Sequence, residues 1–352
     1  MSLLHPIRPE APHLDRLRPE AALPGGTFEV TGSRLAAQGA LQLPRAFFGE
    51  TEAALDLLRP GRVQVRVPQG AIAGDLTLRN GDAASNGLHA NVAIPIADDL
   101  HMISNPAVDG EGNLFAMVSG PRGTRVPVSV FRISRDLQTR PFVRDLLNIS
   151  ALAFGPDGYL YASSRAEGNV YRISPEGAVS TFAEGMGIAT GLAFDRDGNL
   201  YVGDRSGTIF RLGPHGKHNA AEIFVYATLE PSLAAYHLAF RDDGVLLVSA
   251  PTTSSHQPIY AIDPDGSPRV FYRGLGRPQG LALDVEGNVY VAASLAGRRG
   301  IVRLSADGRD AELAVSGNDL VGLCFLEDGA AALATASTLY TVELGIVGRR
   351  LA

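Results

Sequence analysis

Tyr236 and His237 stand next to each other in the sequence, and a histidine beside a hydroxyl group is able to support acid–base chemistry. The imidazole of His237 would act as the general base, and the hydroxyl group of Tyr236 would donate a hydrogen bond to the substrate. A histidine in such a position is more often a hydrogen-bonded structural residue. Both the catalytic and the structural interpretation of this pair stay open.

A further set of polar residues is suited to holding a ligand. Guanidinium groups bind carboxylate and phosphate groups through paired hydrogen bonds, so arginines in polar loops indicate a small polar or anionic ligand. The alternative is that these arginines are solvated or pair with Glu167 and Asp204. The expected ligand-binding residues are Ser104, Ser150, Thr190, Gln279, Arg165, Asp204, Arg205, His256 and Arg298.

These residues fall within a sequence repeat that runs through most of the chain. Each repeat contains an apolar strand, a tight Asp/Gly turn, a second apolar strand and a third strand, which has the form aromatic-Arg-aliphatic in three of the six repeats. The turn glycines, spaced 46, 40, 46, 43 and 42 residues apart, are Gly112, Gly158, Gly198, Gly244, Gly287 and Gly329. A period of about 40–45 residues made of short strands predicts a β-propeller with one four-stranded blade per repeat. We therefore expect an all-β chain with a six-bladed propeller over residues 96–352.

The blade arrangement determines which polar residues meet. In a propeller, the innermost strands begin at the end that also carries the loops between second and third strands. The residues just before the innermost strands are Ser104, Ser150, Thr190, Tyr236, Gln279 and Val321. We expect the polar members to line the mouth of the central tunnel, with Arg165 and Arg205 on loops above them. The sixth repeat lacks an outer strand of its own, so either residues 346–347 or a linker strand such as residues 92–94 completes that blade.

Residues 1–95 lack the repeat and form a separate predicted domain. Residues 62–67 alternate between polar and apolar side chains, which is typical of a half-buried strand, and Gly-rich turns separate several such segments. We expect a small β-sandwich here. The segment resembles the immunoglobulin-like IPT/TIG domain in residues 24–26, 30–33, 48–49, 65–70 and 74–78. The resemblance implies a packing or binding module rather than a catalytic one.

The repeats also carry a family resemblance. The unit from Gly191 to Asp204 resembles an NHL-type repeat, and the run over residues 102–345 is similar to the gluconolactonase/regucalcin-like propellers. This resemblance implies hydrolysis of a lactone or ester, with a divalent cation, often calcium, held by Glu, Asn and Asp side chains just before the innermost strands. Hard cations prefer such oxygen donors. The corresponding residues here include no carboxylate and no Asn, so we expect no metal and no cofactor, with calcium as the alternative.

The composition excludes several classes of protein. The formal net charge is −6 and no long run of Lys or Arg occurs, so we expect no nucleic-acid partner. We expect no membrane span, because no apolar run approaches the roughly 20 residues that one needs. No signal peptide is recognisable, which predicts a cytoplasmic protein, or a secreted or periplasmic one if a leader has been removed. Cys324 is the only cysteine and lies in an apolar strand, so we expect an inert buried thiol.

Taken together, these features favour recognition of a small polar or anionic molecule at the tunnel mouth. If the chain is catalytic, the family resemblance implies a lactone or ester hydrolase. The alternative is a non-catalytic scaffold that binds a protein or glycan partner through either domain.

Overall fold

The structure, a computed structural model, describes residues 11–36, 43–213 and 222–349. These residues form β-strands joined by turns and loops, and no α-helix occurs among them, in agreement with the all-β prediction. None of the described segments is a helix long and apolar enough to cross a bilayer. The chain divides into two compact units, Met1–Ile94 with Ala314–Asn318, and Pro95–Leu313 with Asp319–Ala352.

The first unit contains two sheets that share one apolar core. One sheet has the order β1 (His13–Arg18), β3 (Thr27–Ser33), β7 (Arg62–Arg66) and β6 (Leu55–Arg59). The other contains β2 (Ala21–Ala22), β10 (Leu88–Val92), β8 (Gly74–Asn80), β4 (Arg45–Phe48) and β5 (Thr51–Ala53), with β9 (Ala83–Ala84) paired to β8. Phe28 and Val63 of the first sheet and Leu76 of the second are fully buried in the common core.

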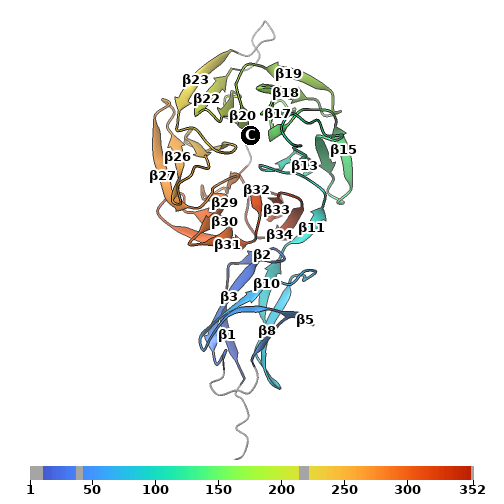
Figure 1. Ribbon diagram of the computed structural model, residues 1–352, viewed down its shortest axis with the longest axis vertical. Coiled ribbons are helices and arrows are strands. Elements are labelled where there is room, and N and C mark those ends of the chain that lie inside the picture. The colour runs from blue at the N-terminus through green and yellow to red at the C-terminus, as the bar shows by residue number, and fades with distance from the viewer. Residues whose placement is uncertain (1–10, 37–42, 214–221, 350–352) are drawn as a thin grey trace, which may run out of the picture. The chain divides into compact units, whose positions relative to one another are not determined.

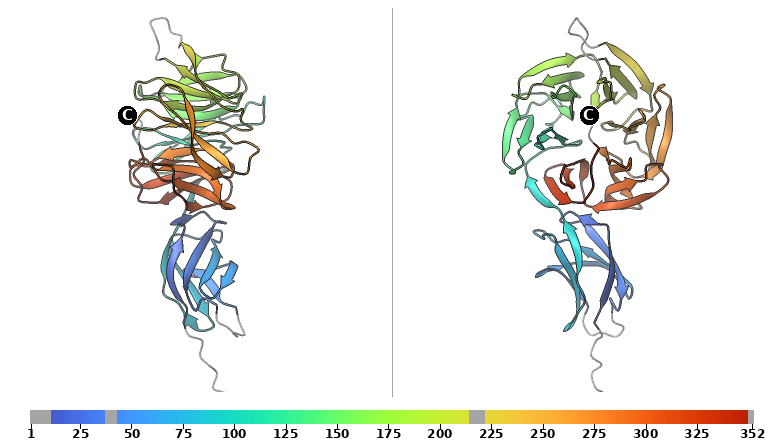
Figure 2. Two further views of the ribbon diagram at one scale, coloured as in Figure 1. Left: turned by 90° about the vertical axis from the view of Figure 1, so that its left-hand side faces the viewer. Right: turned by 180° about the vertical axis from the view of Figure 1, so that it is seen from behind.

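The second unit is a propeller, in which four-stranded sheets follow one another around a ring (Figures 1 and 2). The first three sheets, or blades, are β12 (Ala107–Val108), β13 (Leu114–Met117), β14 (Val130–Ile133) and β15 (Thr139–Val143); β16 (Ile149–Phe154), β17 (Leu160–Ser164), β18 (Asn169–Ile173) and β19 (Val179–Ala183); and β20 (Ala189–Phe194), β21 (Leu200–Asp204), β22 (Thr208–Leu212) and β23 (Ile223–Thr228). The other three are β24 (His237–Phe240), β25 (Leu246–Ser249), β26 (Gln257–Ile262) and β27 (Pro268–Leu275); β28 (Leu281–Leu283), β29 (Val289–Leu295), β30 (Arg298–Leu304) and β31 (Ala311–Ser316); and β32 (Leu320–Phe325), β33 (Ala330–Thr335), β34 (Leu339–Glu343) and β11 (Ile94–Ala97).

The sixth blade is completed by a strand that precedes the first blade in sequence. β11 lies beside β34 at the outer edge of the sheet that also contains β33 and β32. This confirms the linker alternative, although the strand begins at Ile94 rather than at Val92. Pairing β11 with β34 removes an exposed outer edge from the last blade.

The Asp/Gly turns hold the first two strands of a blade together. In the turn between β20 and β21, Asp195 Oδ1 accepts hydrogen bonds from the backbone N–H groups of Asp197 and Asn199, at 3.0 and 2.9 Å. Its Oδ2 accepts from Asn199 Nδ2 at 2.8 Å. Gly198 has a φ of +81°, a conformation that glycine adopts without strain. Both carboxylate oxygens of Asp195 are therefore used within the tight Asp/Gly turn that the repeat predicts.

Aromatic side chains pack each blade against the next. In the first, second, third and fifth blades, a ring on the second strand meets the phenylalanine that ends the innermost strand of the following blade. The pairs, with centroid separations of 5.2, 4.9, 4.8 and 5.0 Å, are Phe115–Phe154, Tyr161–Phe194, Tyr201–Phe240 and Tyr290–Phe325. These edge-to-face contacts explain why large aromatic residues recur at these two strand positions in most of the blades.

Candidate ligand-binding site

Two arginines from neighbouring blades lie where the innermost strands begin. Arg165 directly follows β17, and its backbone N–H donates to the carbonyl of Asn148, just before β16, at 3.1 Å. Arg205 directly follows β21, and its N–H donates to the carbonyl of Ile188, just before β20, at 3.3 Å. Both arginines therefore lie at the end of the propeller to which the sequence assigns them.

These two arginines and Arg122 form a positively charged group, which we call the arginine mouth. Burial, together with the positive charges of Arg205 and Arg122, lowers the pKa of the Arg165 guanidinium. Arg165 Nη2 donates to the carbonyl of Gly120 at 3.1 Å, and Arg205 Nη2 donates to the carbonyl of Leu233 at 2.7 Å. Among the described residues, no carboxylate is ion-paired with either Arg165 or Arg205, and the Nε of each is buried without an acceptor. A guanidinium group has five N–H donors, so most donors of both side chains remain unused.

A second group of basic residues lies at the same end, in the fifth blade. Arg299 Nη2 donates to Gln279 Oε1 at 2.6 Å and to the carbonyl of Leu320, and Nη1 donates to the carbonyl of Arg277 at 2.9 Å. Burial and the nearby charge of Arg277 lower the pKa of Arg299 to about 10. Gln279, predicted to contact a ligand, is thus bonded to an arginine of its own blade.

The neutral residues predicted to line the mouth mainly join one blade to the next. Ser150 Oγ donates to the carbonyl of Ala189 at 2.9 Å, which connects the second blade to the third. Thr190 Oγ1 donates to the carbonyl of Gly203 at 2.7 Å and accepts from the N–H of Tyr236 at 3.1 Å. Ser104 is buried beside Met117, with 3.9 Å between its Oγ and the sulfur. These hydroxyl groups have partners within the protein.

Tyr236 and His237 are both buried. The Tyr236 side chain is fully inaccessible, and its hydroxyl group donates to the carbonyl of Glu230. Burial raises the pKa of Tyr236 to about 12 and lowers the pKa of His237 to about 3. His237 is therefore a neutral imidazole near pH 7, and the Tyr236 hydroxyl group is bonded to a carbonyl in the loop between β23 and β24.

The three remaining predicted residues do not gather around the arginine mouth as one group. Asp204 is 7% exposed and accepts from the N–H groups of Ile188 and Ser206, at 3.0 and 3.3 Å. His256 is exposed, and its Nδ1 is 3.0 Å from Ser255 Oγ. Arg298 is half-buried at the beginning of β30, paired in register with Leu295.

The innermost strands approach one another closely near their beginnings. The N–H of Gly280 donates to the carbonyl of Val321 at 2.9 Å, which joins the fifth and sixth blades. Asn105 lies between the same two blades, since its Nδ2 donates to the carbonyl of Leu281 at 2.8 Å and its Oδ1 accepts from the N–H of Leu323 at 3.1 Å. These contacts join the innermost strands of the fifth and sixth blades near their beginnings.

A cavity of about 940 Å³ occupies the tunnel toward the other end of the innermost strands. Residues from all six innermost strands or their turns line this central cavity, together with residues 347–349. None of the residues predicted from the sequence to bind or react with a ligand lies in its wall. The sequence does carry a signal for the cavity. A small residue recurs at the third position of the Gly-Leu-Ala-Phe element, but the sequence alone does not show that this position faces the tunnel.

The donor set at the beginnings of the innermost strands does not fit a divalent cation. Ser150 and Thr190 offer neutral hydroxyl groups that already bond to backbone groups, whereas such cations prefer charged oxygen donors. Within the part of the chain that the structure describes, no group of three or more His, Cys, Asp or Glu side chains is placed to hold a metal ion. The calcium alternative therefore has no ligand set among these residues.

We expect chelation to leave the stability of the protein unchanged. Adding EDTA to the purified protein should not shift its melting temperature, because a metal that binds only the folded state stabilises it and its removal would lower that temperature. The measurement is differential scanning fluorimetry with and without EDTA, with added calcium as the reverse test. A large drop on chelation, or stoichiometric calcium in the purified protein, would contradict this expectation.

Comparisons with known proteins agree on the fold. The model of the N-terminal region of the strictosidine synthase-like family matches residues 191–212, which lie in β20, β21 and β22. No curated protein matches the chain. A gluconolactonase from Xanthomonas campestris is similar in structure, with a TM-score of 0.59 at 17% identity, over 72% of this chain and 89% of that one.

Two further structures match nearly the whole chain. An auxiliary nutrient binding protein from Bacteroides thetaiotaomicron matches with a TM-score of 0.56 at 12% identity, over 95% of this chain and 98% of that one. Another from Bacteroides ovatus matches with a TM-score of 0.53 at 12% identity, over 98% and 100%. At these identities the likeness concerns the fold alone. The second unit thus has the propeller fold of the gluconolactonase-like and strictosidine synthase-like proteins.

Proposed function

We propose that this chain is a propeller that binds a small anionic molecule at the arginine mouth without converting it. The observation that carries the proposal is the charge of this group. Arg165 lies near two other arginines, has no carboxylate partner among the described residues and uses a single donor, toward Gly120. An anion placed there would relieve the repulsion between the guanidinium groups and accept their unused hydrogen bonds.

The surroundings of the mouth favour binding over catalysis. The metal-binding side chains that the family resemblance implies are replaced by neutral residues, and the hydroxyl group of Tyr236 donates a hydrogen bond to the backbone carbonyl of Glu230. The two full-length structural neighbours named as nutrient binding proteins support a binding role, although their identity of 12% is low. Hydrolysis of a lactone or ester is the second candidate. A neutral imidazole such as His237 near pH 7 is able to accept a proton, and one of the structural neighbours is named as a gluconolactonase. A base whose pKa is about 3 is weak, which makes this candidate the less favoured one.

The first unit has a separate role in this proposal. We propose that residues 1–95 form an IPT/TIG-like sandwich that docks to a protein or glycan, while the propeller binds the small molecule. Its two sheets with a shared core support this assignment. The two nutrient binding proteins also extend over this part of the chain, since they match 95% and 98% of the whole chain.

Calorimetric titration with inorganic phosphate, citrate and gluconate tests the proposed site. We expect one of these anions to bind, and Arg165→Ala or Arg205→Ala to weaken that binding about ten- to a hundredfold. This corresponds to the loss of about 1.5–3 kcal/mol that a hydrogen bond to a charged group contributes. Arg309→Ala is the matched control, because Arg309 is 83% exposed and paired with Asp307 on a turn remote from the beginnings of the innermost strands.

Two results would count against the proposal. One is binding that ignores both Arg165→Ala and Arg205→Ala, and the other is an equal loss in Arg309→Ala. Turnover of gluconolactone or of a nitrophenyl ester that disappears in His237→Gln, in a variant with an unchanged melting temperature, would favour the hydrolase candidate instead.

A further inference from the structure

We infer that the central cavity is a second ligand site, separate from the arginine mouth, and that it takes a neutral apolar small molecule. Its volume of about 940 Å³ is near the upper end of the range of about 300–1,000 Å³ that small-molecule sites cover. The wall, the charges around it and the segment that covers it each support this inference.

The wall contains a small residue at the same register position of every blade. Each of these residues lies in the innermost strand of its blade and lines the central cavity. Its partner in the second strand is a large residue in the first five blades and an alanine in the sixth. The small residues are Ala107, Ala153, Ala193, Ala239, Ala282 and Cys324. A larger side chain at any of these places would occupy the space, so the repeat of small residues keeps the channel open. Leucines at the preceding strand position complete a mainly apolar wall: Leu152, Leu192, Leu238, Leu281 and Leu323.

The charged groups of the wall are already compensated. Asp109 Oδ1 accepts from the backbone N–H groups of Glu111 and Asn113, at 2.9 and 2.8 Å, and its Oδ2 accepts from Asn113 Nδ2 at 2.8 Å. Glu327 has an ion-pair partner in Arg135, at 3.9 Å. A charged ligand would find no unpaired opposite charge among these groups. An apolar molecule has no hydrogen bonds to water to lose when it enters a cavity with an apolar wall. Such a molecule therefore fits the cavity better than a charged ligand does.

The segment of residues 347–349, which we call the strap, covers part of the cavity. The N–H of Val285 donates to the carbonyl of Val347 at 3.0 Å, and the N–H of Arg349 donates to the carbonyl of Leu283 at 2.9 Å. A Cβ added to Gly348 would lie 2.1 Å from the Cβ of Phe325, so the strap packs directly on the innermost strand of the sixth blade. The strap therefore spans the fifth and sixth blades beside the cavity.

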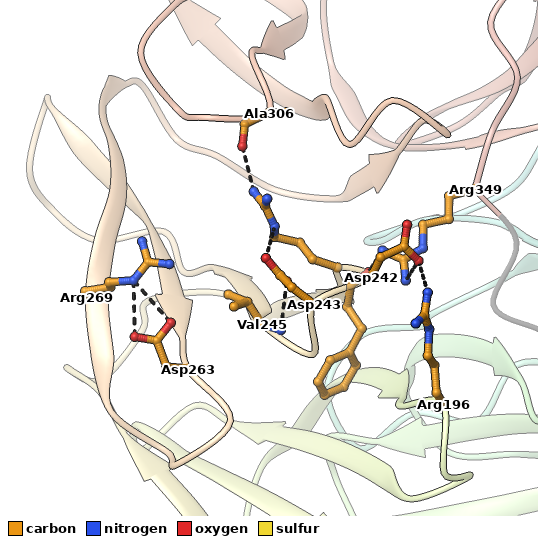
Figure 3. Close-up of polar contacts among 10 residues, drawn as sticks. Arg196, Asp242, Asp243, Val245, Asp263, Arg269, Ala306 and Arg349 are labelled. Carbon is orange, nitrogen blue, oxygen red and sulfur yellow. Dashed lines mark hydrogen bonds and ion pairs between the residues drawn. The ribbon is translucent and has the colours of Figure 1, made fainter.

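The side chain of Arg349 fastens the strap to the fourth blade. Arg349 is 10% exposed, with Nη2 at 2.6 Å from Asp242 Oδ1 and Nη1 donating to the carbonyl of Phe240 at 2.8 Å. Arg196 of the third blade pairs with the same Oδ1 atom of Asp242 (Figure 3). Because residues 347–349 line the cavity, opening of the strap would widen the path by which a ligand enters or leaves it.

Titration of the full chain with N-phenyl-1-naphthylamine, a neutral apolar fluorophore, tests the inference. We expect saturable binding at one site, and at least about tenfold weaker binding in Ala239→Phe and Ala282→Phe, which fill the cavity. Ala153→Leu and Ala282→Leu are milder replacements if a phenylalanine variant does not fold. Phe224→Ser is the matched control, because Phe224 is 55% exposed on β23 and offers apolar surface outside the cavity.

Stopped-flow release of the same fluorophore tests the strap. Arg349→Ala should release it several times faster than the unaltered protein does, while Arg165→Ala and Arg205→Ala should change neither affinity nor rate. The inference is overturned if the fluorophore does not saturate, if the filling variants bind it as tightly as the unaltered protein, or if Phe224→Ser abolishes binding. An unchanged release rate in Arg349→Ala would overturn the role of the strap. None of these outcomes depends on the arginine mouth, so the two sites are tested separately.

Discussion

Gly191→Ala is expected to lower the free energy of unfolding by about 3 kcal/mol, the upper part of the range for overpacking a core. The new Cβ would lie 2.4 Å from the carbonyl oxygen of Tyr236 and 2.9 Å from its carbonyl carbon, both in the backbone of the next blade. A backbone carbonyl cannot rotate away as the end of a flexible side chain can, so the third and fourth blades must separate. Urea denaturation of the variant measures the loss.

Gly213→Ala provides the matched control, because a Cβ at that position would have no atom of the described residues within 4 Å and Gly213 is not in the left-handed region. We expect its stability to change little. Gly280→Ala should behave like Gly191→Ala, since its Cβ would lie 2.0 Å from Asn105 Oδ1 and 2.8 Å from the carbonyl of Val321. Equal stability of Gly191→Ala and Gly213→Ala would show that the innermost strands are not in contact at this end.

Acidification to pH 4 is expected to remove about 3 kcal/mol of stability through His237 alone. Burial lowers the pKa of His237 to about 3 in the folded protein, against an ordinary value of 6.5. Between these two values the unfolded chain takes up a proton that the folded chain does not, so stability falls as the pH drops from about 6.5 to 3. Well above pH 6.5, His237 is neutral in both the folded and the unfolded protein, so it makes no contribution to the pH dependence of stability.

The experiment compares the slope of unfolding free energy against pH in His237→Gln and in the unaltered protein. The variant should lose less stability between pH 7 and pH 4, whatever its stability at pH 7. His256→Gln is the comparison variant, because it replaces an exposed histidine instead of the buried one. A slope that is the same in His237→Gln would mean that His237 is protonated in the folded protein at pH 4.

The repeated strands could be predicted because their signals are local. The apolar run Gly191-Leu192-Ala193-Phe194 followed by an Asp/Gly turn lies within β20 and its turn, and the same correspondence holds in β16 and β32. The sequence left two alternatives for the strand that closes the sixth blade, residues 346–347 and residues 92–94. Both remained because an edge strand needs only a partner strand with free backbone groups, and either segment could pair in this way.

The candidate site was harder to predict, because residue type does not say whether a polar group is already satisfied. The hydroxyl group of Ser150 looks available in the sequence, yet its acceptor is the carbonyl of Ala189, 39 residues further along and in another blade. The positions of Arg165 and Arg205 could be derived from topology, since they follow directly from the order of strands within a blade. The position of the strap could not be derived in this way. Residues 347–349 show no strand pattern in the sequence, and they are held to the blades by backbone hydrogen bonds and by the largely buried side chain of Arg349.

The strand that completes the sixth blade has a consequence for how the propeller folds. Asp98, next to β11, accepts a hydrogen bond from Thr338 Oγ1 at 2.8 Å, and these residues are 240 positions apart in the chain. During synthesis β11 emerges before any blade, while its partner β34 emerges after five blades and most of the sixth. Contacts of such large sequence separation slow folding, because the entropy of closing the loop is lost before the contact forms. The ring therefore closes in a late step, and a chain interrupted before β34 leaves β11 with an unpaired edge that is open to pairing with another molecule.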